Sequence, residues 1–369
     1  MRMYKVAVLG CTGLVGQHFI RMLDNHPFLE VNAIFASESS AGRKYGDVVK
    51  WWAGSELPET VRNMTIKKVD TASLPDDDID IVFSALPAVA AGEIESVLRK
   101  RGYFVFSNTR SHRMDNDVPI LIPEVNAGHL ELAGQQKSKT GGFIITNSNC
   151  STSGLAMALN PISKYGIQSV FVSTYQAISG AGMNGLPALG MEGNIIPFID
   201  GEEEKMEVEL RKILSVYEDQ KFCEPEIPVT VNCCRVPVRE GHLEAVVVRL
   251  RDNIDVPELK SNWSEFRAIP QHLKLPSAPE KPLLVREESD RPQPILDCYA
   301  GSPLRAAGMA VTIGRIRKKG NTVLFLLLVN NMVRGAAGTS ILNAELAVHE
   351  GLLPNRDPGS EKPLMGDIQ

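Results

Sequence analysis

The sequence has no apolar stretch long enough to cross a membrane. Its longest apolar run, "TVLFLLLV" at residues 322–329, is far shorter than the about 20 residues that a membrane-spanning helix needs, and it is typical of a buried strand. The N-terminal "MRMYKVAVLGCTG" runs into a glycine turn and lacks the small-residue cleavage site of a signal peptide. We therefore expect neither a membrane protein nor a secreted one.

Cysteine is also scarce. Six cysteines in 369 residues, with no C-x-x-C pair, do not form a disulfide framework and suggest neither a zinc site nor a redox pair. We expect no metal and a reducing, cytoplasmic setting. That setting removes one interpretation of Asn149-Cys150-Ser151, which is formally an N-glycosylation acceptor, because this motif has meaning only in a secreted chain.

A stripe of basic residues is missing as well. Lys and Arg total 39 against 44 Asp and Glu, for a net charge of -5, so nucleic acid is not an expected partner. Neither internal repeats nor a low-complexity linker is present. What remains is an ordinary globular composition with 43% hydrophobic residues, in a chain longer than the about 250 to 300 residues at which one core usually stops growing. Two domains are therefore expected.

The first part of the chain alternates between strand and helix patterns. β-branched runs that end at glycine or polar residues are followed by helical spacing of apolar residues, as in a βαβ unit. The expected strands are 4–10, 30–37, 79–87 and 103–108, with helices at 14–23 and 88–102. This alternation of strands and helices predicts a doubly wound parallel sheet of the Rossmann type over residues 1–148.

Beyond residue 148 strands outnumber helices, which predicts a second, α+β domain with a mixed or antiparallel sheet over residues 149–334. Its expected elements are strands at 168–176, 230–238, 242–250, 308–316 and 322–331 and a helix at 202–219. We expect this domain to carry catalysis and dimerisation, since its strands are strongly apolar. A final helix, within 335–369, is expected to join the first domain, with a loosely ordered tail from 352.

Gly10, Gly13 and Gly16 form G-x-x-G-x-x-G between the first strand and the first helix. Glycines at this place let the backbone approach a pyrophosphate held at the helix N-terminus, although a tight turn alone would also use them. We expect a dinucleotide here, contacted by the loop residues Gly10, Thr12, Gly13, Leu14 and Val15.

The end of the second strand indicates which dinucleotide binds. NAD-type folds usually place Asp or Glu here for the ribose 2′-hydroxyl, whereas "ASESSAGRK" offers hydroxyls and cations. Ser37, Ser40 and the cations Arg43 and Lys44 favour a 2′-phosphate and therefore NADP, while Glu38 keeps NAD open.

Cys150 lies in "NSNCSTSG", directly before a helix-like segment. A thiol at the first turn of a helix feels the positive end of the macrodipole, which lowers its pKa, and the same amides can hold an oxyanion. Ser151 and Thr152 would begin that helix. Free cysteines are commonly just buried, so the residues alone leave both a nucleophile and a packing role open.

A possible partner is His242, at the mouth of a strand after the turn at Gly241. Arg235 lies in an apolar context, where a cation is costly unless it meets an anion, and Arg110 and Arg113 follow a parallel strand at the ligand-binding edge of the sheet. A surface histidine and structural ion pairs are the alternatives. Together with the dinucleotide site, thiol, imidazole and arginines indicate covalent aldehyde oxidation or its reverse.

In these motifs the chain resembles the aspartate-semialdehyde dehydrogenase family, in its archaeal and fungal branch. The likeness runs over most of residues 3–350, through "AVLGCTGLVGQ", "SNCST", "YQAISGAG", "GEEEK", "CRVPVREGH", "DRPQP" and "NNMVRGAAG". The resemblance implies NADPH-dependent reduction of L-aspartyl 4-phosphate to L-aspartate 4-semialdehyde and phosphate through a cysteine thioester, toward lysine, threonine and methionine. It also implies a homodimer or homotetramer.

The resemblance assigns roles by position. Cys150 would be the nucleophile, His242 the acid/base and Gln176 the residue that orients the substrate. Arg235 would bind the α-carboxylate of the substrate and Glu202 its ammonium. Arg113 and Lys205 would bind the phosphate, with Asn108 beside them. Ser179, Gly180 and Asn331 would contact the cofactor, Asn331 at its nicotinamide end.

Two positions depart from the family pattern. Ser39 stands where many relatives have an arginine beside the 2′-phosphate, and Asn330 replaces a common aspartate.

The nearest alternative function is malonyl-CoA or succinyl-CoA reduction on the same scaffold, against which "SNCST" and "RVPVREGH" argue. Reduction of N-acetylglutamyl phosphate would not need Glu202 to meet an ammonium. A regulator that binds a nucleotide without chemistry is the alternative from another class, and the dinucleotide fingerprint argues against a cysteine protease.

Overall fold

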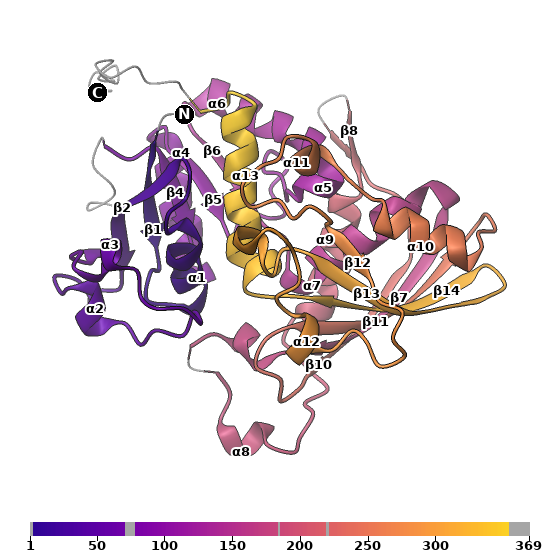
Figure 1. Ribbon diagram of the computed structural model, residues 1–369. Coiled ribbons are helices and arrows are strands. Elements are labelled where there is room, and N and C mark those ends of the chain that lie inside the picture. Colours follow the sequence, from indigo (N-terminus) through magenta and orange to yellow (C-terminus); the bar gives the residue numbers. More distant parts are fainter. Residues whose placement is uncertain (1–2, 71–77, 184, 219–220, 354–369) are drawn as a thin grey trace.

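The computed structural model describes residues 3–70, 78–183, 185–218 and 221–353. Figure 1 shows two sheets, each with its own helices, lying side by side. No helix in these ranges is long and apolar enough to span a membrane. Most of the predicted loose tail lies outside the described residues.

The first sheet is parallel, with strand order β3-β2-β1-β4-β5-β6, which confirms the predicted doubly wound fold. Its strands are β1 (Tyr4–Leu9), β2 (Leu29–Ala36), β3 (Lys67–Lys68), β4 (Ile81–Ser84), β5 (Phe104–Ser107) and β6 (Phe143–Thr146). Alternate strand residues enter two different cores, because successive side chains point to opposite faces. One face packs against helices α1 (Leu14–Leu23) and α13 (Gly338–His349), and the other packs against α4 (Ala88–Lys100).

The second sheet is mixed, with order β10-β7-β11-β14-β13-β12. The pairs β10/β7 and β12/β13 are parallel and the other pairs are antiparallel. Its strands are β7 (Ile167–Gln176), β10 (Val229–Arg235), β11 (His242–Leu250), β12 (Leu283–Val285), β13 (Val311–Lys319) and β14 (Thr322–Val329). Helices α7 (Cys150–Leu159), α9 (Glu202–Ile213) and α10 (Val256–Ser264) cover its inner face with an apolar core.

Shorter elements connect these parts. They are α2 (Tyr45–Val48), α3 (Glu59–Arg62), α5 (Pro123–Asn126), α6 (Glu131–Thr140), α8 (Ala188–Met191), α11 (Ile269–His272), α12 (Pro294–Asp297) and the hairpin strands β8 (Val216–Glu218) and β9 (Lys221–Cys223).

The helix expected over 202–219 is shorter than predicted, because α9 ends at Ile213. The Ser215 hydroxyl donates to the Lys212 carbonyl at 2.6 Å and so satisfies an acceptor at the helix end. The following Val216 and Tyr217 then pair with β9. A β-branched residue followed by an aromatic one suits this hairpin better than another helical turn.

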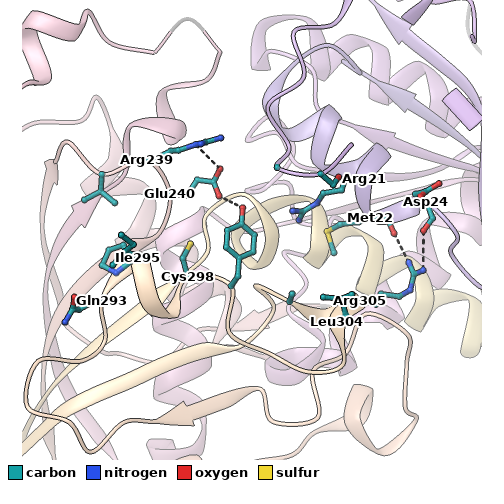
Figure 2. A pocket seen from close by; sticks show the side chains of 16 residues that line it. Arg21, Met22, Asp24, Arg239, Glu240, Gln293, Ile295, Cys298, Leu304 and Arg305 are labelled. Carbon is teal, nitrogen blue, oxygen red and sulfur yellow. Dashed lines mark hydrogen bonds and ion pairs between the residues drawn. The ribbon is translucent and has the colours of Figure 1, made fainter. Parts of the chain in front are cut away.

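Helix α13 and Arg305 are among the contacts that join the two parts of the chain. Helix α13, yellow in Figure 1, follows the second sheet in sequence but packs against the first. Arg305, from the second part, donates to the carbonyls of Met22, Asp24 and Asn25 at the end of α1, as Figure 2 shows for the first two. The domain ranges 1–148 with 335–369, and 149–334, remain our proposal, which this packing of α13 supports.

Candidate active site

The glycine-rich loop lies between β1 and α1. Gly10 has φ +79°, and a Cβ there would lie 2.5 Å from the carbonyl oxygen of Ala85, so only glycine fits. A Cβ on Gly16 would lie 2.2 Å from the oxygen of Gly10, so this glycine lets α1 pack closely on the loop. Gly13 caps α1 without a side chain, which leaves the first-turn N–H groups open to an anion.

The polar loop after β2 offers hydroxyls in place of an acid. The Ser37 and Ser39 hydroxyls lie 3.0 Å apart, and Arg43 and Lys44 are exposed nearby in sequence. Glu38 forms an ion pair with Lys68 at 3.4 Å, so its charge is engaged at the surface. These residues fit a 2′-phosphate better than a ribose 2′-hydroxyl.

A cavity of about 950 Å³ connects this nucleotide loop with Cys150. Its wall includes Gly10 and Leu14 from the nucleotide loop, together with Cys150 and Arg235. A single ligand surface can therefore run from the glycine loop to the thiol.

Cys150 is the first residue of α7, as predicted. Asn149 caps this helix, because its Oδ1 accepts from the N–H groups of Ser151 at 2.9 Å and Thr152 at 3.2 Å. Gly335, in the irregular π-helical turn before α13, packs directly on the cysteine: a Cβ at 335 would lie 2.5 Å from Cys150 Cβ.

Two carboxylates of α9 hold Asn149 in place. Its Nδ2 donates to Glu202 Oε1 at 2.7 Å, and its backbone N–H donates to Glu209 Oε2 at 2.5 Å. Both glutamates are buried. The orientation of the nucleophile's helix therefore depends on α9.

Arg113, which follows β5 of the first sheet, binds the carboxylate of Glu209. Its Nη1 donates to Glu209 Oε1 at 2.8 Å and its Nη2 donates to the Asn108 carbonyl at 3.4 Å. The buried Nε has no hydrogen-bond partner within the described ranges. Since Arg113 lines the cavity with Lys205, this guanidinium has donor capacity left for an anion.

Three strands place Arg235, Gln176 and His242 on one rung of the second sheet. Arg235 of β10 pairs with Gln176 of β7, and the β7/β11 register brings His242 next to Gln176. All three side chains are buried on the inner face. The strand register explains why these three side chains lie close together, because side chains at paired positions of neighbouring strands are about 5 Å apart.

His242 has a defined proton position. Its Nδ1 accepts from the Ala177 N–H at 3.0 Å, so the neutral ring carries its proton on Nε2. That atom has no partner among the residues that the structure describes. Burial, with Arg235 as a second cause, lowers the pKa of His242 to about 3, so the ring is neutral.

Gly180 separates His242 from the cavity. A Cβ at 180 would lie 2.8 Å from Arg235 Nη1 and 3.5 Å from His242 Nε2. Gly180 lines the cavity but His242 does not. The absence of a side chain at 180 is therefore what leaves the imidazole close to the cavity wall.

The Cys150 thiol is protonated in this environment. Burial first and Glu202 second raise its pKa to about 12, against the opposing effects of Arg113, Arg235 and the Ser151 N–H, so the lowered pKa expected from the helix start is not found. Binding of a cation to Glu202 would remove one of the raising causes.

A second polar rung lies beneath the first. Cys233, Thr174 and Glu244 pair across β10, β7 and β11, and the next rung inward is Val231, Val172 and Val246. Gln176 Nε2 donates to Thr174 Oγ1 at 3.2 Å and lies 3.7 Å from Cys233 Sγ. Burial, with Glu202 as a second cause, raises the pKa of Glu244 well above 4.5, and neither of its oxygens has a partner in the described part of the chain.

Asn331 lines the cavity, and Asn330 lies next to it in sequence but not on the cavity wall. Asn331 accepts from the Gly241 N–H at 2.9 Å and donates to the Ser179 hydroxyl at 2.8 Å. Asn330 Oδ1 accepts from two backbone N–H groups while its Nδ2 donates to Cys298 Sγ at 3.2 Å. The amide at 330 thus has a use that an aspartate could not supply.

The cavity brings together nearly all of the predicted site residues. These are Gly10, Thr12, Gly13, Leu14, Val15, Ser37, Asn108, Arg113, Cys150, Gln176, Ser179, Gly180, Glu202, Lys205, Arg235 and Asn331. Ser40 and His242 are not on its wall. Sequence reasoning missed the turn after β4, with Ala85, Leu86 and Pro87, although its place at the carboxyl edge of a parallel strand was a usable signal.

A second cavity, of about 1200 Å³, lies between the end of α1 and the loop around α12. Figure 2 shows Glu240 on its wall close to Arg239. Glu240 also accepts a hydrogen bond from the hydroxyl of Tyr299. None of the predicted site residues lines it. Among the described residues no group of three or more His, Cys, Asp or Glu side chains could hold a metal ion.

Known proteins resemble the chain over nearly its whole length. The family model "Semialdehyde dehydrogenase, NAD binding domain" matches residues 5–133, and "Semialdehyde dehydrogenase, dimerisation domain" matches residues 159–334. The aspartate-semialdehyde dehydrogenase of Methanothermobacter thermautotrophicus is 46% identical over 93% of this chain and 99% of its own. The malonyl CoA reductase (NADP) of Metallosphaera sedula is 38% identical over 96% and 99%. A crystal structure of aspartate semialdehyde dehydrogenase with NADP from Candida albicans superposes with a TM-score of 0.84 at 36% identity, covering 95% of this chain and 100% of that one.

Proposed function

The chain belongs to the aspartate-semialdehyde dehydrogenase family, and on that premise we propose how its site performs the reaction. The reaction is the NADPH-dependent reduction of L-aspartyl 4-phosphate to L-aspartate 4-semialdehyde and phosphate. The observation that carries the proposal is one cavity that joins the glycine loop to Cys150, Arg113, Arg235 and Glu202.

Charges at the thiol end match a phosphorylated amino acid. Arg235 faces the cavity as the cation for the α-carboxylate, and Glu202 supplies the carboxylate for the ammonium. Arg113 and Lys205 supply cations for the phosphate. Glu202 already pairs with Lys205 at 3.5 Å and accepts from Asn149, and a substrate ammonium would add a further cation to this carboxylate. Malonyl-CoA has no such ammonium, which favours aspartyl phosphate as the substrate.

The residues then have the following tasks. Cys150 sulfur bonds to the acyl carbon while the carbon–oxygen bond to phosphate breaks, and the thiol proton leaves with the phosphate toward Arg113 and Lys205. NADPH supplies the hydride that reduces the thioester. The Nε2–H of His242 would stabilise the oxyanion that forms, and breakage of the carbon–sulfur bond would release the aldehyde and the Cys150 thiolate. One proton taken up from solvent, with His242 as the acid/base, restores the thiol.

The nucleotide end fits NADP in two places. The N-terminus of α1 and its glycine loop accommodate the pyrophosphate, and the hydroxyls of Ser37 and Ser39 with Arg43 and Lys44 suit the 2′-phosphate. Asn331 would meet the nicotinamide end, a role supported by its presence on the wall of the cavity that also includes the glycine loop and Cys150.

The outer face of the second sheet is a candidate interface for a homodimer. Phe171 and Tyr175 of β7 are exposed there, and the half-buried Leu243, Val247 and Leu326 are on the same face. A contiguous apolar patch of this kind marks an interaction surface. The matched dimerisation model covers these strands, which supports a second copy as the occupant.

The first test measures NADPH formation from L-aspartate semialdehyde, phosphate and NADP⁺. Wild-type protein should turn over only with phosphate present and should prefer NADP⁺ to NAD⁺. Cys150→Ala should lose about 10⁴-fold or more of this rate while still binding NADPH, since it removes the nucleophile but not the nucleotide loop.

The same assay separates the alternatives. Equal turnover of malonyl-CoA, or no aldehyde oxidation without CoA, would contradict the proposal. A wild-type protein that binds NADPH without turnover, and whose binding is unchanged in Cys150→Ala, would instead indicate a nucleotide-binding protein whose thiol has no chemical role.

A further inference from the structure

Glu209 holds two parts of the site together although it is absent from the cavity wall. Its Oε1 accepts from Arg113 Nη1 at 2.8 Å, and its Oε2 accepts from the N–H of Asn149 at 2.5 Å. One carboxylate therefore bridges the phosphate-side arginine and the residue that caps the helix of Cys150. Glu209 is only 2% exposed, so neither bond competes with bulk water.

Glu209 belongs to a stripe on one face of α9. Glu202, Lys205, Glu209 and Lys212 are spaced three or four residues apart, which places them above one another on a helix. Glu202 contacts the side chain of Asn149, and Lys205 lines the cavity. The stripe aligns four charged side chains of one rigid element with the reacting groups.

Lys212, at the end of the stripe, fixes the segment that carries Arg113. Its Nζ donates to the carbonyls of Arg113 at 2.7 Å, Asp115 at 2.8 Å and Val118 at 2.8 Å. The backbone of residues 113–118 is thus bound to the same helix as the Arg113 side chain. A shift of α9 would move both together.

On the basis of the function proposed above, we propose that Glu209 is a positioning residue that sets the phosphate-binding guanidinium and the Cys150 helix in one geometry. By accepting from Nη1 it fixes the guanidinium of Arg113, which lines the cavity and keeps further N–H groups for an anion. By accepting from Asn149 it fixes the start of α7. The carbonyl to be attacked and its leaving phosphate therefore meet groups that are aligned before the substrate arrives.

Glu209→Gln tests this proposal. Its single carbonyl oxygen can accept only one of the two bonds, and its NH₂ group meets a donor at the other. With phosphate varied in the oxidative assay, we expect the KM for phosphate to rise about tenfold or more and kcat to fall, while the NADPH Kd and the KM for the semialdehyde change little. Alkylation of Cys150 by iodoacetamide should change in rate as well.

Glu204→Gln is the matched control, because Glu204 lies on the same helix but is exposed. A second comparison combines Glu209→Gln with Arg113→Gln. If Glu209 acts through Arg113, the double variant should have the phosphate KM of Arg113→Gln alone.

Two results would overturn the inference: equal phosphate KM in Glu209→Gln and Glu204→Gln, or additive effects in the double variant. A fall in all parameters together, with a lower Tm, would show that Glu209 only stabilises the fold. If wild-type protein failed to oxidise aspartate semialdehyde, the proposed function would fail instead, which is a distinguishable outcome.

Discussion

At the scale of single residues, Gly335 is the tightest constraint on the nucleophile. It contacts the cysteine from the turn before α13, far along the chain from α7. Gly335→Ala would place a methyl group 2.5 Å from Cys150 Cβ and 2.9 Å from its Cα, so the cysteine must move. We expect kcat to fall about 100-fold, since displacement of a reacting group by about 1 Å has such an effect.

The measurement is kcat in the phosphate-dependent assay, with NADPH binding by fluorescence as the control for folding. Gly128→Ala is a matched variant, because a Cβ at 128 has no heavy atom within 4 Å. Equal kcat in the two variants would show that the cysteine has room to shift without loss.

Sequence patterns located the reacting residues unevenly. Cys150 was recognisable at a helix start, and Arg235 was recognisable as a cation in an apolar strand. Glu209 and Glu244 were not recognisable from the sequence. A glutamate on an amphipathic helix or strand is normally predicted to face solvent, and only the packing of the folded chain shows that these two are buried. The family resemblance supplied Glu202 and Lys205, but not the bonds that Glu209 makes with Arg113 and Asn149.

At the scale of elements, β7, β10 and β11 form two polar rungs above an apolar one. Strand register explains this order, since a slip of one strand by one residue would move its inner-face side chains to the outer face. Burial raises the pKa of Glu244 in the lower rung well above 4.5, which favours the protonated form. A neutral acid is the form that this position can hold without an unpaired charge.

The elevated pKa makes Glu244 a source of pH-dependent stability. The unfolded state ionises this group above about pH 4.5 while the folded state keeps the proton, so the free energy of unfolding falls as pH rises from there toward the folded pKa. Each unit of pH in that window costs about 1.4 kcal/mol. Glu244→Gln should therefore have a higher Tm than wild type at pH 8 and no such advantage at pH 4.

Thermal unfolding of the two proteins across pH 4 to 8 measures this difference, and other titrating groups cancel in the comparison. Glu204→Gln, at an exposed site, should follow the wild-type curve. A Tm difference that stays constant over the pH range would mean that Glu244 has an ordinary pKa.

At the scale of the whole molecule, the outer face of the second sheet decides the assembly. Phe171 is 40% exposed near the middle of the face proposed as the dimer interface. Phe171→Glu would bury a charge in a dimer but expose it harmlessly in a monomer. We expect sedimentation to show a dimer for wild type and a monomer for this variant, with the circular dichroism spectrum unchanged.

A mutation on another surface provides the comparison. Val89→Glu changes a fully exposed residue at the start of α4, on the first domain, and should leave the assembly intact. A dimer that survives Phe171→Glu would place the interface on a different face.

The order of elements was predictable for the first sheet and less so for the second. Alternation of strands and helices prescribes a parallel sheet, and the expected strands and helices agree with it to within a few residues. The mixed sheet depends on pairings between segments far apart in sequence, such as β11 with β14, which local patterns do not encode. For the same reason α9 was predicted too long: the hairpin that follows it becomes favourable only through its partner strand.

The packing of α13 has a consequence for how the protein is made. Ser340 and Asn343 of this helix contact the side chain of Asn147, which accounts for the exit of β6 toward Cys150. During synthesis the ribosome delivers the nucleotide loop, then the thiol, then the second sheet, and only afterwards the helix that closes the first core and secures that exit. A nascent chain thus holds every reacting side chain before it holds the geometry that makes them reactive. We therefore expect competence for catalysis only after α13 has been synthesised and has packed on the first sheet.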